Sequence, residues 1–174
     1  MLAGLRGALW QWRSGVQAAG APMIGPGCIL RVEPGGSLVI GRHCSLDRDV
    51  EIVVGAGARL EIGDHVYVGH GTTIACFQSI RIGAETMIAD LVSIRDMNHR
   101  RIPGLPLRHS GIETREITIG RNCWLASKVT VVAGTQLADD VTVAANAVVT
   151  GHFQEKTLIG GVPARVLRSS EAVQ

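Results

Sequence analysis

Aliphatic residues recur at every sixth position along most of this chain. A short unit, aliphatic-x-Ile-Gly, opens the pattern four times, at residues 38–41, 60–63, 80–83 and 117–120. The last series is the longest and runs through Ile119, Leu125, Val131, Leu137, Val143 and Val149. A small residue directly follows most of these positions, and a small or β-branched residue usually stands four positions after them.

A period of six fits neither an α-helix nor a simple alternating strand. It fits a short strand followed by a tight corner, so three such units would close one triangular coil. Stacked coils would bury the aliphatic column and pair their backbones with one another. Glycine is favoured at corners that need a positive φ. We therefore predict an all-β chain whose residues 22–151 form a parallel β-helix, although the hand of the coil does not follow from the period.

The period is interrupted in three places. Four-residue insertions occur at residues 36–39 and 58–61, and the pattern disappears between His99 and Glu116. This long stretch contains two prolines, two glycines and five basic side chains, one of them a histidine. A long loop that leaves a regular solenoid is usually functional. We expect such an inserted loop over residues 100–116.

The two ends of the chain differ from the repeat. Apolar residues from Leu2 to Ala19 are spaced by three and four, which predicts an amphipathic helix over residues 1–21. Such a helix would cover the open edge of the solenoid. Contact with a partner subunit is an alternative, and so is attachment to a membrane surface through Arg6 and Arg13. Residues 152–174 are expected to form a C-terminal segment.

Composition narrows the class of protein. Only 3% of residues are aromatic and 18% are charged, while 46% are hydrophobic, which excludes disorder and argues against a helical bundle. The formal net charge of +2 is too weak to indicate a nucleic-acid partner. No apolar run is long enough to span a membrane, and Arg6 and Arg13 interrupt any signal-peptide core. We expect a cytoplasmic protein.

Cysteine and histidine side chains are the first candidates for catalytic or metal-binding chemistry. The four cysteines lie far apart without a CxxC motif, so we expect free, reduced and buried thiols. His43 and His65 fall on the outer surface, where solvated side chains are expected. His99 ends the segment Arg95-Asp96-Met97-Asn98-His99, where the coil breaks into the long loop. An imidazole can accept a proton near neutral pH, and Asp96 could orient it. Alternatively, His99 only caps the start of the loop through hydrogen bonds.

Residues 24–168 resemble the hexapeptide-repeat acyltransferases, most closely the O-acetyltransferases of galactosides, maltose and polysaccharide precursors. The C-terminal third carries most of the resemblance, with IGRNCWLAS at 119–127, VVAGT at 131–135, VVT at 148–150 and GGVPARVLR at 160–168. The Asp-x-x-His before the loop resembles the catalytic segment of that family. The resemblance implies a left-handed β-helix and a homotrimer with active sites between subunits.

The resemblance also implies an acetyl-CoA-dependent transfer to a sugar hydroxyl that needs no metal. His99 would be the general base, and Asp96 would orient it. The implied contacts to acetyl-CoA are Trp124, Ala126, Ser127, Ala144, Ala145, Thr150, Arg165 and Arg168, and the C-terminal segment would close the cofactor site. The expected acceptor contacts are Asp90, Asn98, Arg101 and Arg108. Gly151 stands where the family has a lysine after Val-Val-Thr.

Other functions remain open at this stage. The acceptor could be an amine, as in N-acetylation of an amino sugar. A metal enzyme similar to the γ-class carbonic anhydrases would need three protein ligands, but the position of its second histidine is Ala75 here. A non-catalytic β-helix scaffold would not bind acetyl-CoA. The basic loop would suit a phosphorylated, nucleotide-linked or acidic acceptor.

Overall fold

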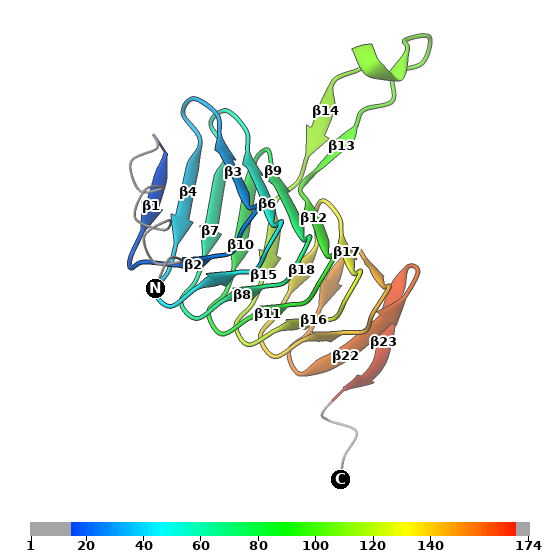
Figure 1. Cartoon of the computed structure of the whole chain (residues 1–174). Helices are drawn as coiled ribbons and strands as arrows, with labels where there is room; N and C mark the ends of the chain where they lie inside the picture. Colours follow the sequence, from blue (N-terminus) through cyan, green and yellow to red (C-terminus); the bar gives the residue numbers. More distant parts are fainter. Residues whose placement is uncertain (1–14, 170–174) are drawn as a thin grey trace.

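The computed structural model describes residues 15–169, which form a left-handed parallel β-helix (Figure 1). Three parallel sheets, here called A, B and C, are the sides of a triangular prism, and the chain visits them in that order. The six strands of sheet C mark six complete coils. The predicted fold class is confirmed for this part of the chain.

The strands of each sheet follow one another along the prism. Sheet A contains β1 (Val16–Ala18), β4 (Ser37–Ile40), β7 (Arg59–Ile62), β10 (Ser79–Ile82), β15 (Ile117–Ile119), β18 (Gln136–Leu137) and β21 (His152–Phe153). Sheet B contains β2 (Met23–Ile24), β5 (Ser45–Leu46), β8 (Tyr67–Val68), β11 (Met87–Ile88), β16 (Trp124–Leu125), β19 (Thr142–Val143), β22 (Thr157–Gly161) and β23 (Ala164–Ser169). Sheet C contains β3 (Ile29–Val32), β6 (Glu51–Val54), β9 (Thr73–Cys76), β12 (Ser93–Arg95), β17 (Thr130–Val131) and β20 (Val148–Val149).

The first coils are wider than the last ones. Strands β4, β7 and β10 have four residues each, whereas β18 has two, and sheet C shortens in the same way. The insertions at 36–39 and 58–61 supply this extra length, because they add a second buried residue such as Leu38 or Leu60 to the sheet A strands. The solenoid therefore narrows after β12, and the long interruption of the repeat begins at that point.

Corner geometry differs from the expectation that the small residues carry a positive φ. Positive φ values occur three positions after the inward aliphatic residue, at His43, His65, Asn122 and their counterparts. Gly41, Gly63, Gly83 and Gly120 directly follow that residue and have no positive φ. A Cβ atom on any of these four glycines would lie 2.5–2.6 Å from backbone atoms of the following coil. They are small because consecutive coils approach closely at this corner.

The predicted N-terminal helix is wrong for residues 15–21. Val16–Ala18 form β1, which pairs in parallel with Leu38–Ile40 of β4, and Val16 is buried in the core. Pairing with the neighbouring strand therefore makes this segment a β-strand, although its apolar residues are spaced as in a helix. The rest of the predicted helix, residues 1–14, lies outside the described residues. Within residues 15–169, no helix is long and apolar enough to cross a membrane.

The long interruption is a projecting β-hairpin (Figure 1). Strand β13 (Met97–His99) pairs antiparallel with β14 (Ile112–Thr114), and a short 3-10 helix, η1 (Leu107–His109), lies near the tip. The insertion is confirmed, but it begins before residue 100, and it contains two paired strands and a 3-10 helix where the sequence predicted a loop. Arg100, Arg101 and Arg108 are exposed on it.

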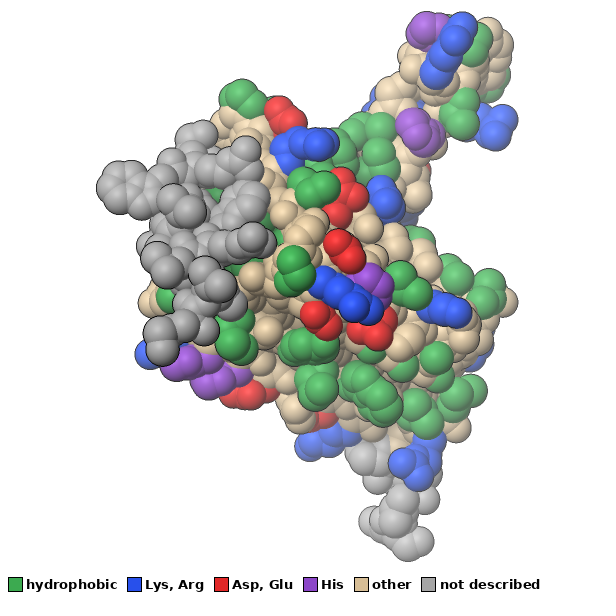
Figure 2. All heavy atoms as spheres, viewed as in Figure 1, with side chains coloured by type: hydrophobic (Ala, Val, Ile, Leu, Met, Phe, Trp, Pro, Cys, Tyr) green, Lys and Arg blue, Asp and Glu red, His purple; other side chains and the backbone are tan. Residues whose placement is uncertain are grey.

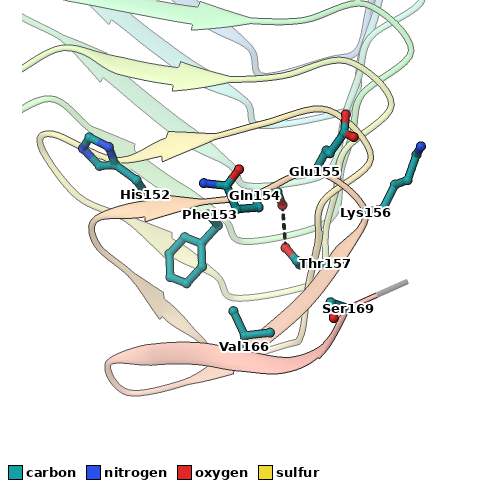
Figure 3. Close-up of a pocket in the computed structure, with 8 residues that line it drawn as sticks. All are labelled: His152, Phe153, Gln154, Glu155, Lys156, Thr157, Val166 and Ser169. Carbon is teal, nitrogen blue, oxygen red and sulfur yellow. Dashed lines mark hydrogen bonds between the residues drawn. The ribbon is translucent and has the colours of Figure 1, made fainter. Parts of the chain in front are cut away.

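The C-terminal segment continues the solenoid and then folds back along the last strand of sheet B. β21 and β22 begin a seventh coil, and β23 turns back antiparallel on β22 after a cis Val162–Pro163 bond. A cavity of about 500 Å³ lies between this hairpin and β21. Figure 3 shows the side chains of Phe153 and Val166 directed toward each other in it, beside the hydrogen bond from Thr157 Oγ1 to the Gln154 carbonyl (2.8 Å).

All four cysteines are free, as expected. Cys44, Cys76 and Cys123 are buried, and Cys28 is half-buried. The thiols of Cys44 and Cys123 donate to the carbonyls of Gly63 (3.0 Å) and Ala138 (3.3 Å), in the same way that Thr86 donates to Gly120 (2.9 Å). Burial raises the pKa of Cys123 to about 11, so its thiol is protonated at neutral pH.

Substitution of Gly83 by Ala should destabilise the protein. The new Cβ would lie 2.5 Å from the Gly120 carbonyl group, and such overpacking costs about 1–3 kcal/mol. Gly20→Ala is the matched control, because its Cβ would lie 3.9 Å from its nearest neighbour, in Arg42. Urea unfolding would measure both changes. Equal stability of the two variants would contradict the close-approach explanation.

Candidate active site

Asp96 is a buried carboxylate at the point where the chain leaves the solenoid. Its Oδ1 accepts a hydrogen bond from the Phe77 amide (2.7 Å), and its Oδ2 accepts from the amides of Gln78 (2.8 Å) and Ser79 (2.9 Å). Those three amides belong to the corner of the preceding wide coil. Buried amides need acceptors, and the chain that turns outward into the hairpin supplies a side chain in place of backbone carbonyls.

This arrangement corrects the expected role of Asp96. Both carboxylate oxygens face the corner at residues 77–79, and no hydrogen bond joins Asp96 to His99 among the described residues. The Asp96 carbonyl also accepts from the Arg115 amide (2.9 Å), which closes the base of the hairpin. Asp96 therefore anchors the hairpin that carries His99.

The Cys76 thiol lies beside this carboxylate. Burial raises the pKa of Cys76 to about 12, and the charge of Asp96 is a second cause.

His99 lies on β13, opposite Ile112 of β14. It is exposed, and within residues 15–169 its ring has no hydrogen bond or ion pair. Asn98 is its neighbour on the same strand and pairs with Glu113. Arg100 and Arg101 follow His99 in the chain, whereas Arg108 lies in η1 near the tip, where its Nε donates to His109 Nε2 (3.1 Å). The imidazole of His99 is therefore open to contact with a bound molecule.

Most of the expected acetyl-CoA contacts lie on sheet B or at the corner between sheets B and C. Trp124 is on β16 with its side chain 51% exposed, between Met87 of β11 and Thr142 of β19. The other residues of this group follow β16 and β19 directly; they are Ala126, Ser127, Ala144 and Ala145. All four side chains are small and at least partly exposed.

The remaining expected residues are divided between the corner of sheets C and A, strand β23 of sheet B, and the corner of sheets B and C. Thr150 follows β20 at the corner between sheets C and A, which is the corner from which the hairpin projects two coils earlier. Arg165 and Arg168 are exposed on β23, and Arg165 Nη1 donates to the Ala164 carbonyl (2.8 Å). Asp90 lies at the corner between sheets B and C, where its Oδ1 accepts from the His70 amide (3.1 Å). Within one chain, the expected cofactor residues other than Thr150 share sheet B or its corner with sheet C, whereas the expected acceptor residues are divided between the hairpin and that corner.

Sequence analysis missed an apolar column on the outer face of sheet B. Tyr67, Met87 and Trp124 are direct cross-strand neighbours, and Figure 2 shows apolar side chains gathered over β8, β11 and β16. The signal was available, because each residue directly precedes an inward aliphatic position on a sheet B strand. Tyr67 donates to Asp47 Oδ2 (3.2 Å), and burial together with this carboxylate raises the pKa of Tyr67.

The described part of the chain contains no group of three His, Cys, Asp or Glu side chains arranged to hold a metal ion. His70, five residues before Ala75, has its Nδ1 3.3 Å from Arg48 Nε and 3.7 Å from Asp49 Oδ2.

Part of the repeat matches a known protein family. Residues 116–151 match the family model described as bacterial transferase hexapeptide (six repeats). This match covers the coils from β15 to β20 and not the whole solenoid. The resemblance to the hexapeptide-repeat acyltransferases is thereby confirmed.

Two curated relatives come from Escherichia coli (strain K12). One is named as a lipopolysaccharide biosynthesis O-acetyl transferase and is 36% identical over 85 residues, covering 44% of this chain and 43% of the relative. The other is galactoside O-acetyltransferase, which is 32% identical over 72 residues and covers 38% of this chain and 36% of the relative. The chain therefore matches less than half the length of either curated relative.

Two solved structures share the hexapeptide-repeat fold. An acetyltransferase from Vibrio cholerae, solved with acetyl coenzyme A, superimposes with a TM-score of 0.62 at 25% identity, covering 95% of this chain and 76% of that one. An N-acyltransferase from Bacillus cereus, solved with dTDP and coenzyme A, has a TM-score of 0.75 at 14% identity, covering 93% of this chain and 88% of that one. The second likeness concerns the fold alone.

Replacement of Asp96 by Asn should destabilise the base of the hairpin. The amide NH2 group would face backbone donors, and each buried donor left without an acceptor costs about 1–3 kcal/mol. Asp139→Asn is the control, because Asp139 is exposed and its carboxylate accepts a single hydrogen bond, from the Arg121 amide (2.7 Å). Urea unfolding and hydrogen exchange at residues 77–79 would show a larger effect for Asp96. Equal losses would contradict an anchoring role.

Proposed function

We propose that this protein is an acetyl-CoA-dependent O-acetyltransferase that modifies a hydroxyl group of a sugar or glycan precursor. The observation that carries the proposal is the exposed His99 imidazole, held on a hairpin that leaves the solenoid just before the matched transferase repeats. The curated relatives named above are O-acetyl transferases of lipopolysaccharide and galactosides, which supports a carbohydrate acceptor.

The chemistry assigned to His99 is general base catalysis. One ring nitrogen accepts the proton of the acceptor hydroxyl while its oxygen attacks the thioester carbonyl carbon. The new ester C–O bond forms, the C–S bond breaks, and the departing thiolate of coenzyme A takes up a proton. A positioned base contributes about 10²- to 10⁴-fold to such a rate. Asp96 contributes indirectly, because it anchors the hairpin on which His99 is placed.

We assign acetyl-CoA to the outer face of sheet B near Trp124. The exposed indole offers an apolar surface, and Ser127 and Ala145 leave room for an extended pantetheine arm at the neighbouring corner. Arg165 and Arg168 are exposed on the strand that ends sheet B, where guanidinium groups can form paired hydrogen bonds with phosphates. The acetyltransferase from Vibrio cholerae was solved with acetyl coenzyme A bound, which supports this choice of co-substrate.

The position of His99 favours an active site shared between copies of the chain. His99 projects from the corner between sheets C and A, whereas Trp124 and Ser127 belong to sheet B and its corner with sheet C. Sheet C separates these groups within one chain. We therefore propose a homotrimer in which the hairpin of one copy lies against the sheet B face of a neighbouring copy, so that the sites lie between subunits.

His99→Ala should abolish acetyl transfer while leaving acetyl-CoA binding within a few-fold of the unmodified protein. Removal of the base lowers the rate by about 10²- to 10⁴-fold without removing a cofactor contact. His109→Ala is the matched control, since His109 is also exposed but lies in η1 near the hairpin tip. Calorimetry with acetyl-CoA and thiol release with a panel of sugars and amino sugars would measure binding and turnover.

The outcomes separate the competing functions. Turnover only with amines would assign N-acetylation in place of O-acetylation. Absence of acetyl-CoA binding would overturn the acyltransferase proposal and leave a scaffold. Unchanged turnover in His99→Ala would remove His99 as the base, even if acetyl-CoA binds.

A further inference from the structure

His43 and His65 form a stacked pair on the surface of the solenoid, far from His99 in the fold. They occupy the same position on consecutive coils, at the corner between sheets A and B, and their ring centroids are 4.8 Å apart. Both have a φ of 57° and are exposed. Figure 2 shows histidine side chains gathered at the lower left edge of the N-terminal coils.

Neither ring is used by the rest of the structure. Among residues 15–169, no hydrogen bond or ion pair involves the ring nitrogens of His43 or His65. The neighbouring Arg42 is engaged instead by Asp64, with Nη2 2.8 Å from Oδ2. Glu85 takes the same corner position on the next coil, so a further carboxylate adds negative potential beside the pair.

We propose that His43 and His65 together bind a late first-row divalent cation, such as Zn²⁺, Ni²⁺ or Cu²⁺. Neutral imidazole is a preferred ligand of these ions. The hydrogen-bonded ladder holds the two rings side by side, so a modest rotation of each about its Cβ–Cγ bond directs one nitrogen from each toward a shared ion. Water completes the coordination shell, which makes this an exposed two-ligand site unlike the three-ligand sites of catalytic zinc.

The matched variants are His43→Asn and His65→Asn. Asparagine is tolerated in this backbone conformation, as Asn122 shows at the same corner position with a φ of 51°. Each variant therefore removes a ligand while keeping the fold, which thermal unfolding without metal would verify. His152→Asn is the control, because His152 is an exposed histidine on β21, remote from the pair.

Calorimetric titration with ZnCl₂, NiCl₂ and CuCl₂ should show one ion bound per chain at pH 7.5, with Cu²⁺ tighter than Ni²⁺. Either substitution should weaken binding at least about tenfold, whereas His152→Asn should not. MgCl₂ should give no binding, since Mg²⁺ prefers oxygen ligands.

Absence of binding by all three metals would overturn the site. Binding that persists unchanged in both His43→Asn and His65→Asn would also overturn it, because the ion would then be held elsewhere. Neither result depends on whether the protein transfers acetyl groups, so the test stands apart from the proposed function.

Discussion

The hydrogen-bonded ladder between consecutive coils is the constraint on which the rest of this structure depends. Parallel pairing places each strand about 4.8 Å from the next and repeats the same register along the prism. One inward aliphatic residue per unit then fills the core, and the residue after it must be small because the next coil passes so close to Gly63 or Gly83. Any segment that leaves the ladder must also replace the hydrogen bonds that it abandons. Asp96 does so at the base of the hairpin, where its carboxylate accepts from three amides.

The sequence was sufficient to predict features that depend on the repeat itself. The six-residue period predicted the β-helix, and its loss after His99 predicted the insertion, because both follow from which residues face the core. The direction of the Asp96 side chain could not be predicted from Asp-x-x-His spacing. It depends on amides at residues 77–79, and these lack backbone acceptors only because the next coil turns outward.

The two other errors have a similar origin. The spacing of apolar residues by three and four predicted a helix. Val16–Ala18 instead pair with β4 as the first strand of sheet A. Glycine at the corners suggested positive φ, yet that conformation falls two residues later, on His43, Asn122 and similar residues. From the sequence alone, a corner glycine that is needed for a positive φ looks the same as one that is needed because a Cβ would not fit. Only the distance to the following coil distinguishes them.

A solenoid distributes side chains along separate faces and corners, and this determines how it can build binding sites. Residues on different corners of one chain, such as His99 and Ser127, are kept apart by an intervening sheet, so the proposed acyl transfer site requires a second copy. Residues at the same corner position on successive coils are instead brought into contact by the ladder, as His43 and His65 are. Those positions point to solvent and contribute nothing to the aliphatic core. A pair of ligands can therefore arise there without altering the packing that holds the coils together, and the metal site we propose is of that kind.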